Sequence, residues 1–214
     1  MSKYVNMSVC DLRGLGLEEA RQVKEIVNTA LVVFPSDGGP ELESALAAIP
    51  MRNVACTLRL PRKEKLSTRN GLAVLTEAEL KQEGTLVVNG LCVVPTHVEA
   101  PLRQLVINGT LIHQKNTALS LLVMNGEDIA VDFDEFLQIN DDIELDVELM
   151  QEAEKKTLFL INGDLEIPEE VTPALLKEKE PYFVVNGDVS CPTKAHAAYL
   201  RLHGRLNGGL DVTG

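Results

Sequence analysis

The sequence predicts a mainly β protein, a parallel β-helix (solenoid) of about eight coils of roughly 19 residues, with an N-terminal α/β cap. Three observations favour this fold. A segment of apolar residues, Asn-Gly and alternating residues recurs along the chain. The apolar residues are mostly Val, Leu and Ile, with no Trp and 4% aromatics, which suits thin stacked β-layers. The recurring asparagines are also spaced about one coil apart.

Residues 1–60 form the predicted cap, which consists of two helix-strand units. Residues 17–27 place apolar side chains on one helical face, and residues 31–34 then resemble a strand. Residues 40–49 repeat the helix, with Pro40 as its expected first residue, and residues 54–60 return to strand. We expect these units to cover the open end of the core, because an uncovered solenoid end exposes strand edges.

Residues 61–214 form the predicted solenoid, continuous with the cap as one elongated domain. Clear copies of the repeat read TLVVNGLCVVP, QLVINGTLI, LLVMNGEDIAV, LFLINGDLEIP and YFVVNGDVSCP, and three weaker copies align with them. Successive corner positions are 15 to 24 residues apart, with a mean of 19. Hairpin turns of a meander would lie about 8 to 12 residues apart. The predicted corner residues are Asn70, Asn89, Asn108, Asn125, Asn140, Asn162, Asn186 and His203.

The corner residue types have a physical reason to recur. Stacked coils bend at the same height, so each Asn can adopt a left-handed conformation while its amide bonds to the Asn above and below. The following Gly removes a Cβ clash. Residues before the corner are apolar and should be covered on both sides, whereas residues after it alternate. Residues 147–155 and 169–180 look helical, and a return helix over the first strand would explain that double burial.

The C-terminal coils, roughly residues 199–212, are the predicted self-association surface. Residues 208–214 keep strand-like alternation with no polar helix after them, which invites end-to-end pairing. Because the other end is capped, we expect a homo-oligomer, and a closed tail-to-tail dimer rather than a filament. Leu210 and Val212 are the residues at which an added charge should dissociate it.

The LVVNGxLxV coils of residues 66–214 resemble those of the bactofilins, a polymer-forming family of bacterial β-helix scaffold proteins. The resemblance implies a non-enzymatic scaffold or assembly protein. Bactofilins have a near-uniform coil core between flexible tails, whereas this sequence has helical units within residues 17–49 and irregular return segments.

The net charge of −12 comes from one part of the chain. Residues 127–180 contain 18 acidic residues and four lysines. A field of this sign repels phosphate backbones and anionic lipids, so we expect neither nucleic acid nor membrane as a partner. An acidic strip could instead bind carbohydrate or cations, or act on polysaccharide, if its carboxylates lie about 5 to 9 Å apart in adjacent coils. Its residues are Asp132, Asp134, Asp141, Asp142, Glu144 and Asp146.

No catalytic, cofactor or metal site is predicted, and the natural ligand stays open. A zinc site built from Cys92 and His97, or from Cys191, His196 and His203, would have spacings that match no standard site. The scattered cysteines are expected to be reduced core thiols. With no export signal or apolar span, the sequence favours a cytoplasmic protein.

Overall fold

The computed structural model describes residues 2–214, and the chain divides into two compact units, with the division between Ala130 and Val131. Both units are mainly β, and the strand pairs that define their sheets are parallel. The boundary expected at residue 60 lies inside the first unit, between its two sheets. No helix within residues 2–214 has both the length and the apolar character needed to cross a bilayer.

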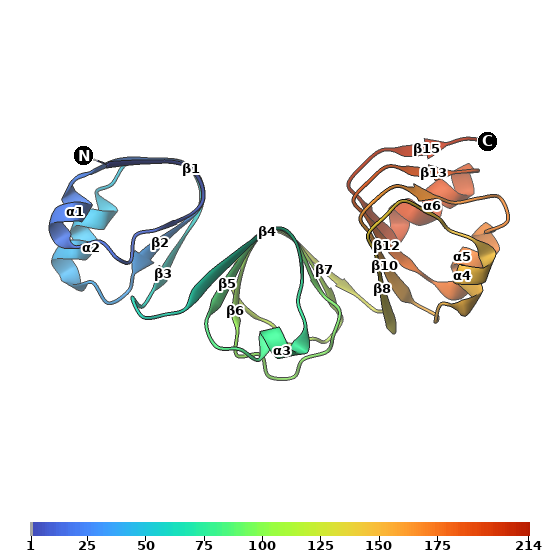
Figure 1. The fold of residues 1–214 in the computed structure, drawn as a ribbon, viewed down its shortest axis with the longest axis horizontal. Coiled ribbons are helices and arrows are strands. Elements are labelled where there is room, and N and C mark those ends of the chain that lie inside the picture. The colour runs from blue at the N-terminus through green and yellow to red at the C-terminus, as the bar shows by residue number, and fades with distance from the viewer. Residues whose placement is uncertain (1) are drawn as a thin grey trace. The chain divides into compact units, whose positions relative to one another are not determined.

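The first sheet of the first unit has three strands in chain order, connected by two helices that lie across from its bend (Figure 1). Core residues on the helix side include Cys10, Ile26, Val32, Phe34 and Leu46. The strands are β1 (Ser2–Asp11), β2 (Val23–Pro35) and β3 (Met51–Leu60), and the helices are α1 (Leu17–Arg21) and α2 (Gly39–Ala47).

The helix predicted over residues 17–27 is too long, because α1 ends at Arg21 and β2 begins at Val23. The segment after Arg21 pairs in parallel with β1, where Ser2 aligns with Val23 and Val5 with Val27. β-Branched residues fit a pleated sheet better than a helix. Strand pairing therefore overrides the helical pattern of apolar residues.

The second sheet of the first unit has four strands, each of which bends at its Asn-Gly pair and continues. Adjacent strands keep their register through the bend, with Asn70 aligned with Asn89 and Asn89 with Asn108. The elements are β4 (Leu66–Val74), α3 (Glu77–Leu80), β5 (Thr85–Val94), β6 (Gln104–Gln114) and β7 (Ser120–Val131).

The residues before each corner in β5 and β6 are covered on both sides, but the expected return helix does not explain this. On one face Leu86 and Val88 contribute to the core inside the bend. On the other face Val87 belongs to a cluster with Leu31 and Val33 of β2. Sheet-on-sheet packing within the first unit therefore supplies the second cover.

A buried arginine links the two sheets of the first unit through the segment between β3 and β4. Arg13 donates to both carboxylate oxygens of Asp11 and to the carbonyls of Pro61 and Glu64. Burial acts to raise the pKa of Asp11, but the Arg13 hydrogen bonds hold it below its usual value.

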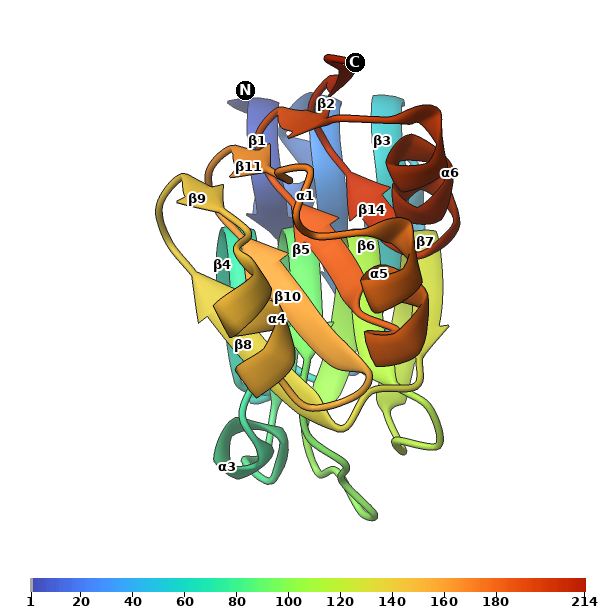
Figure 2. The same cartoon turned by 90° about the vertical axis from the view of Figure 1, so that its right-hand side faces the viewer.

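The second unit consists of two four-stranded parallel sheets that meet at a corner, with three helices along the opposite side (Figures 1 and 2). One sheet contains β8 (Glu135–Ile139), β10 (Thr157–Ile161), β12 (Tyr182–Val185) and β14 (Gly204–Leu206). The other contains β9 (Ile143–Glu144), β11 (Leu165–Glu166), β13 (Val189–Cys191) and β15 (Leu210–Val212). The helices are α4 (Val147–Glu152), α5 (Pro173–Lys179) and α6 (Lys194–Leu202).

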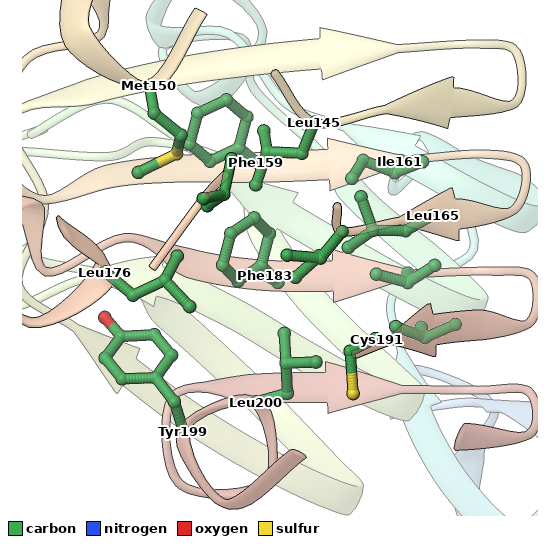
Figure 3. Packing of buried hydrophobic residues seen from close by; sticks show 14 of the residues in the cluster. Leu145, Met150, Phe159, Ile161, Leu165, Leu176, Phe183, Cys191, Tyr199 and Leu200 are labelled. Carbon is green, nitrogen blue, oxygen red and sulfur yellow. The ribbon is translucent and has the colours of Figure 1, made fainter. Parts of the chain in front are cut away.

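Side chains from both sheets and all three helices fill the core of the second unit (Figure 3). Phe159 and Phe183 occupy neighbouring strands and stack with ring centroids 5.4 Å apart. Met150 of α4, Leu176 of α5 and Leu200 of α6 are fully buried in the same cluster. Each repeat thus contributes two strands to a continuous core, and each of the first three also contributes a helix.

Candidate functional site

Asparagine side chains form hydrogen-bonded ladders along the corners at which a sheet bends or two sheets meet, and we call each side chain a rung. In the first unit Asn89 donates to Asn70 at 2.9 Å, Asn108 to Asn89 at 2.8 Å, and Asn125 to Asn108 at 3.5 Å. Each Nδ2 points to the preceding repeat and each Oδ1 to the following one. The ladder therefore has a direction and two distinct ends.

The ladder of the second unit ends at Asn207, not at the predicted His203. Asn162 donates to Asn140 at 2.7 Å, Asn186 to Asn162 at 2.7 Å, and Asn207 to Asn186 at 2.6 Å. His203 caps the end of α6 and stacks on Tyr199, with ring centroids 4.4 Å apart. The prediction misaligned the last repeat because Tyr199 to Leu202, interpreted as strand, lie in α6.

A third ladder, which the repeat alignment missed, runs along the first sheet. Asn28 donates to Asn6 at 3.0 Å, and Asn53 to Asn28 at 2.8 Å. These three asparagines adopt positive φ angles of 52° to 57°, and no glycine follows them. In the β4–β7 sheet the glycine after each Asn takes the positive φ instead. The recurrence of Asn at residues 6, 28 and 53 was the available signal.

Glycine is required after most rungs because each repeat stacks on the backbone of the preceding one. A Cβ at Gly187 would lie 2.3 Å from the Gly163 carbonyl oxygen, and a Cβ at Gly208 would lie 2.2 Å from that of Gly187. Real Cβ atoms do not approach a carbonyl this closely. Asp141 occupies the equivalent place in the first repeat of the second unit. Its side chain is tolerated because β8 and β9 are the edge strands of their sheets.

A row of aspartates beside the second ladder binds backbone amides of the next repeat. The Asp142 carboxylate accepts from Asp164 N at 2.8 Å, and the Asp164 carboxylate from Asp188 N at 2.8 Å. The Asp188 carboxylate accepts from Gly209 N at 2.7 Å. These aspartates hold successive repeats in register, so part of the acidity of this region is structural.

An acidic groove of about 400 Å³ lies on the sheet formed by β9, β11, β13 and β15. Glu144 and Glu166 are in register on neighbouring strands, where side chains are spaced by about 4.8 Å. The six carboxylates that line the groove are those of Asp142, Glu144, Asp164, Glu166, Asp188 and Asp211.

The predicted acidic strip does not come together as one site. Only Asp142 and Glu144 line the acidic groove. Asp146 is the N-cap of α4, where it accepts from Leu149 N at 2.7 Å. The other three residues lie elsewhere: Asp132 forms an ion pair with Lys156, Asp134 precedes β8, and Asp141 occupies the ladder corner.

Strands β14 and β15, which we call the tail edge, are the last strands of the two sheets in the second unit. Val212 is 37% exposed, and Leu202 beside the edge is 76% exposed. Leu206 and Leu210 are half-buried and pack against the core. The two residues predicted for self-association, Leu210 and Val212, therefore differ in role, because Leu210 packs against the core whereas Val212 is exposed at the surface.

Cys10, Cys92 and Cys191 are buried, whereas Cys56 is half-buried with its Sγ 3.4 Å from Asn108 Oδ1. Within residues 2–214 no three or more His, Cys, Asp or Glu side chains converge to hold a metal ion. Burial raises the pKa of Cys92 to about 12 and that of Cys10 to about 11. His196 is buried beside Thr193 Oγ1, at 2.8 Å, and the Val171 carbonyl, at 2.7 Å. These contacts give His196 a structural role.

Comparison with models of protein families, with curated proteins and with solved structures found no match to this chain.

Proposed function

We propose that this chain is a non-enzymatic assembly protein whose repeats are coils of a β-solenoid. In this proposal the tail edge pairs with the tail edge of a second copy, giving a closed homodimer. A two-fold axis across the edge makes β14 and β15 self-complementary, because it aligns each last strand antiparallel to a strand of the partner.

The observation that carries the proposal is the presence of two open strand edges at one end of the second unit. β14 and β15 occupy the outermost positions of adjacent sheets and are joined by the short corner after Leu206. An open edge presents unpaired backbone N–H and C=O groups, which favour pairing with another strand. Val212 adds an exposed apolar side chain to this edge.

The opposite end of the second unit favours a closed dimer over a filament. A filament requires the tail of one copy to stack on β8 and β9 of the next. Wherever repeats stack here, a Cβ after the rung would lie 2.2 to 2.5 Å from the preceding carbonyl group, as the distances at Gly163, Gly187 and Gly208 show. Asp141 carries a Cβ at this place. A copy stacked in the same geometry would collide with it.

Molar mass by light scattering over a tenfold concentration range tests this proposal. We expect the mass of the wild-type chain to rise from 23.4 kDa toward twice that value. Val212→Lys should remain monomeric, because it places a charge in the proposed interface. Val5→Lys is the matched control, since Val5 is similarly exposed but lies on β1. A monomeric wild type, or equal masses for wild type and Val212→Lys, would contradict the proposal.

A second candidate function is the binding of carbohydrate or loosely held cations in the acidic groove. It is favoured by the in-register pair of Glu144 and Glu166, whose like charges repel each other unless a cation or donor group lies between them. Calorimetric titration with calcium or neutral oligosaccharides should show binding that Glu166→Gln weakens. Glu148→Gln, on the exposed face of α4, should leave binding unchanged. Equal heats for both variants would remove this candidate.

The resemblance to bactofilins stays a prediction, as does the cytoplasmic location. Both are compatible with a self-associating scaffold.

A further inference from the structure

We propose that the outer rungs of the asparagine ladders are sites of spontaneous deamidation, and that the ladder protects the inner rungs. The chain contains Asn-Gly at every rung of the β4–β7 ladder and at three rungs of the second unit. Glycine lacks a Cβ that would shield its backbone nitrogen. Asn-Gly is therefore the pair of residues most open to this reaction.

The reaction needs only water as a co-reactant. The glycine backbone nitrogen attacks Cγ of the asparagine side chain and forms a C–N bond, while the Cγ–Nδ2 bond breaks. Ammonia leaves and takes the proton from the glycine nitrogen. Water then adds to one of the two carbonyls of the resulting cyclic imide, and ring opening gives aspartate or isoaspartate.

An inner rung cannot reach the attack geometry without breaking two ladder hydrogen bonds. Asn89 donates to Asn70 and accepts from Asn108, so both ends of its amide are fixed. The glycine after it is also confined, because Gly90 packs against the Gly71 carbonyl. Asn108, Asn162 and Asn186 are held between neighbouring rungs in the same way.

An outer rung has a ladder bond on one side only. Asn125 combines the longest bond of its ladder, 3.5 Å, with an exposed side chain. Asn207 is exposed and donates to Asn186, and Asn70 is exposed and accepts from Asn89. We assign Asn125 as the fastest site, followed by Asn70 and Asn207.

The deamidation rate of Asn186 distinguishes protection by the ladder from protection by burial. Its side chain is exposed, like that of Asn207, yet it is bonded to rungs on both sides. If exposure set the rate, Asn186 and Asn207 would react alike. If the ladder sets it, Asn186 reacts as slowly as the less exposed Asn162.

Peptide mapping by mass spectrometry after incubation of the folded chain at mildly alkaline pH tests the proposal. We expect outer rungs to react about tenfold or more faster than inner rungs, since misplacing reacting atoms by about an ångström costs on the order of 100-fold in rate. In denaturant all seven Asn-Gly pairs should react at similar rates. Equal rates for Asn186 and Asn207 in the folded chain, at a concentration at which light scattering shows a monomer, would overturn the proposal.

Two reciprocal variants extend the test. Asn70→Ala makes Asn89 an outer rung, so the Asn89 rate should rise about tenfold while that of Asn186 stays the same. Asn207→Ala should raise the rate at Asn186 and leave Asn108 unchanged. Circular dichroism establishes that each variant is folded. An unchanged rate at the newly outer rung of a folded variant would contradict the proposal, and the wild-type map decides it alone if a variant does not fold.

Discussion

Glycine follows asparagine at most rungs, and at most of these positions in both units a Cβ would collide with the preceding repeat. In the β4–β7 sheet the glycines adopt positive φ angles, for example 142° at Gly109. In the second unit Gly163, Gly187 and Gly208 have no such angle, and close contacts with the preceding repeat alone exclude a side chain. The sequence predicts the Asn-Gly corner, but it cannot separate these causes because the dipeptide is the same.

Replacing Gly187 with alanine should destabilise the fold by about 1–3 kcal/mol, the usual cost of overpacking. The new Cβ would lie 2.3 Å from the Gly163 carbonyl oxygen. Gly14→Ala is the control, since a methyl group there would meet no heavy atom within 4 Å beyond its chain neighbours. Urea denaturation should show a reduced midpoint for Gly187→Ala alone. Similar midpoints for both variants would contradict the stacking account.

An inner rung should contribute more stability than an outer one. Asn89→Ala removes two ladder hydrogen bonds, whereas Asn70→Ala removes one. At about 0.5–1.5 kcal/mol for each hydrogen bond, we expect Asn89→Ala to lower the free energy of unfolding about twice as much. Thermal and urea denaturation measure both values. A larger loss for Asn70→Ala would show that the ladder bonds are not the stabilising contact.

Buried thiols should be inert in the folded chain. Because the pKa of Cys92 in the folded state is about 12, against 9.0 for an ordinary thiol, its thiolate is scarce at pH 8. The raised pKa also makes the free energy of unfolding depend on pH. The contribution of Cys92 is fully present below pH 9 and is lost as the pH rises toward 12, because the thiol of the unfolded chain loses its proton first. Cys56 is only half-buried and should react first with a thiol reagent. Reaction of Cys92 as fast as Cys56 at pH 8 would contradict this assignment.

Of the helices in the second unit, α4 and α5 can be predicted from the sequence and α6 cannot. The expected helices within residues 147–155 and 169–180 contain α4 and α5, whose N-caps Asp146 and Thr172 are ordinary start signals. The sequence does not reveal α6, because two possible corners, His203-Gly204 and Asn207-Gly208, follow each other closely. Aligning the repeat on His203 turns the end of α6 into a predicted strand. Strand pairing of Leu206 with Val185 fixes the correct choice, and this long-range contact is invisible in sequence.

The N-cap of α6 makes more side-chain contacts than the N-cap of α5. Thr193 accepts from Ala195 N and His196 N and also bonds to the His196 ring, whereas Thr172 at the start of α5 accepts from Leu175 N. Loss of an N-cap costs about 1 kcal/mol, so Thr193→Ala should cost more than Thr172→Ala. Chemical denaturation of both variants measures the difference. An equal cost would mean that the His196 contact adds nothing.

At the scale of the whole molecule, the sequence predicts the mainly β class and the parallel stacking of repeats, but not the division into two units. Two signals mark the division. The spacing from Asn125 to Asn140 is 15 residues, the shortest between the predicted corners, and Asp141 stands where the other rungs of the Asn-Gly ladders are followed by glycine. The acidic groove could not be predicted because its carboxylates come from four neighbouring repeats, which only the register brings together.

Hydrogen–deuterium exchange of the β14 and β15 backbone amides at low and high protein concentration tests the tail-edge dimer most directly. Pairing of the two edges converts unpaired backbone N–H groups into backbone hydrogen bonds between strands. The dimer therefore predicts slower exchange in residues 204–212 at high concentration. The amides of β7, the last strand of the β4–β7 sheet, should exchange at the same rate in both samples. Identical exchange of β14 and β15 at both concentrations, across a range in which the molar mass doubles, would contradict it.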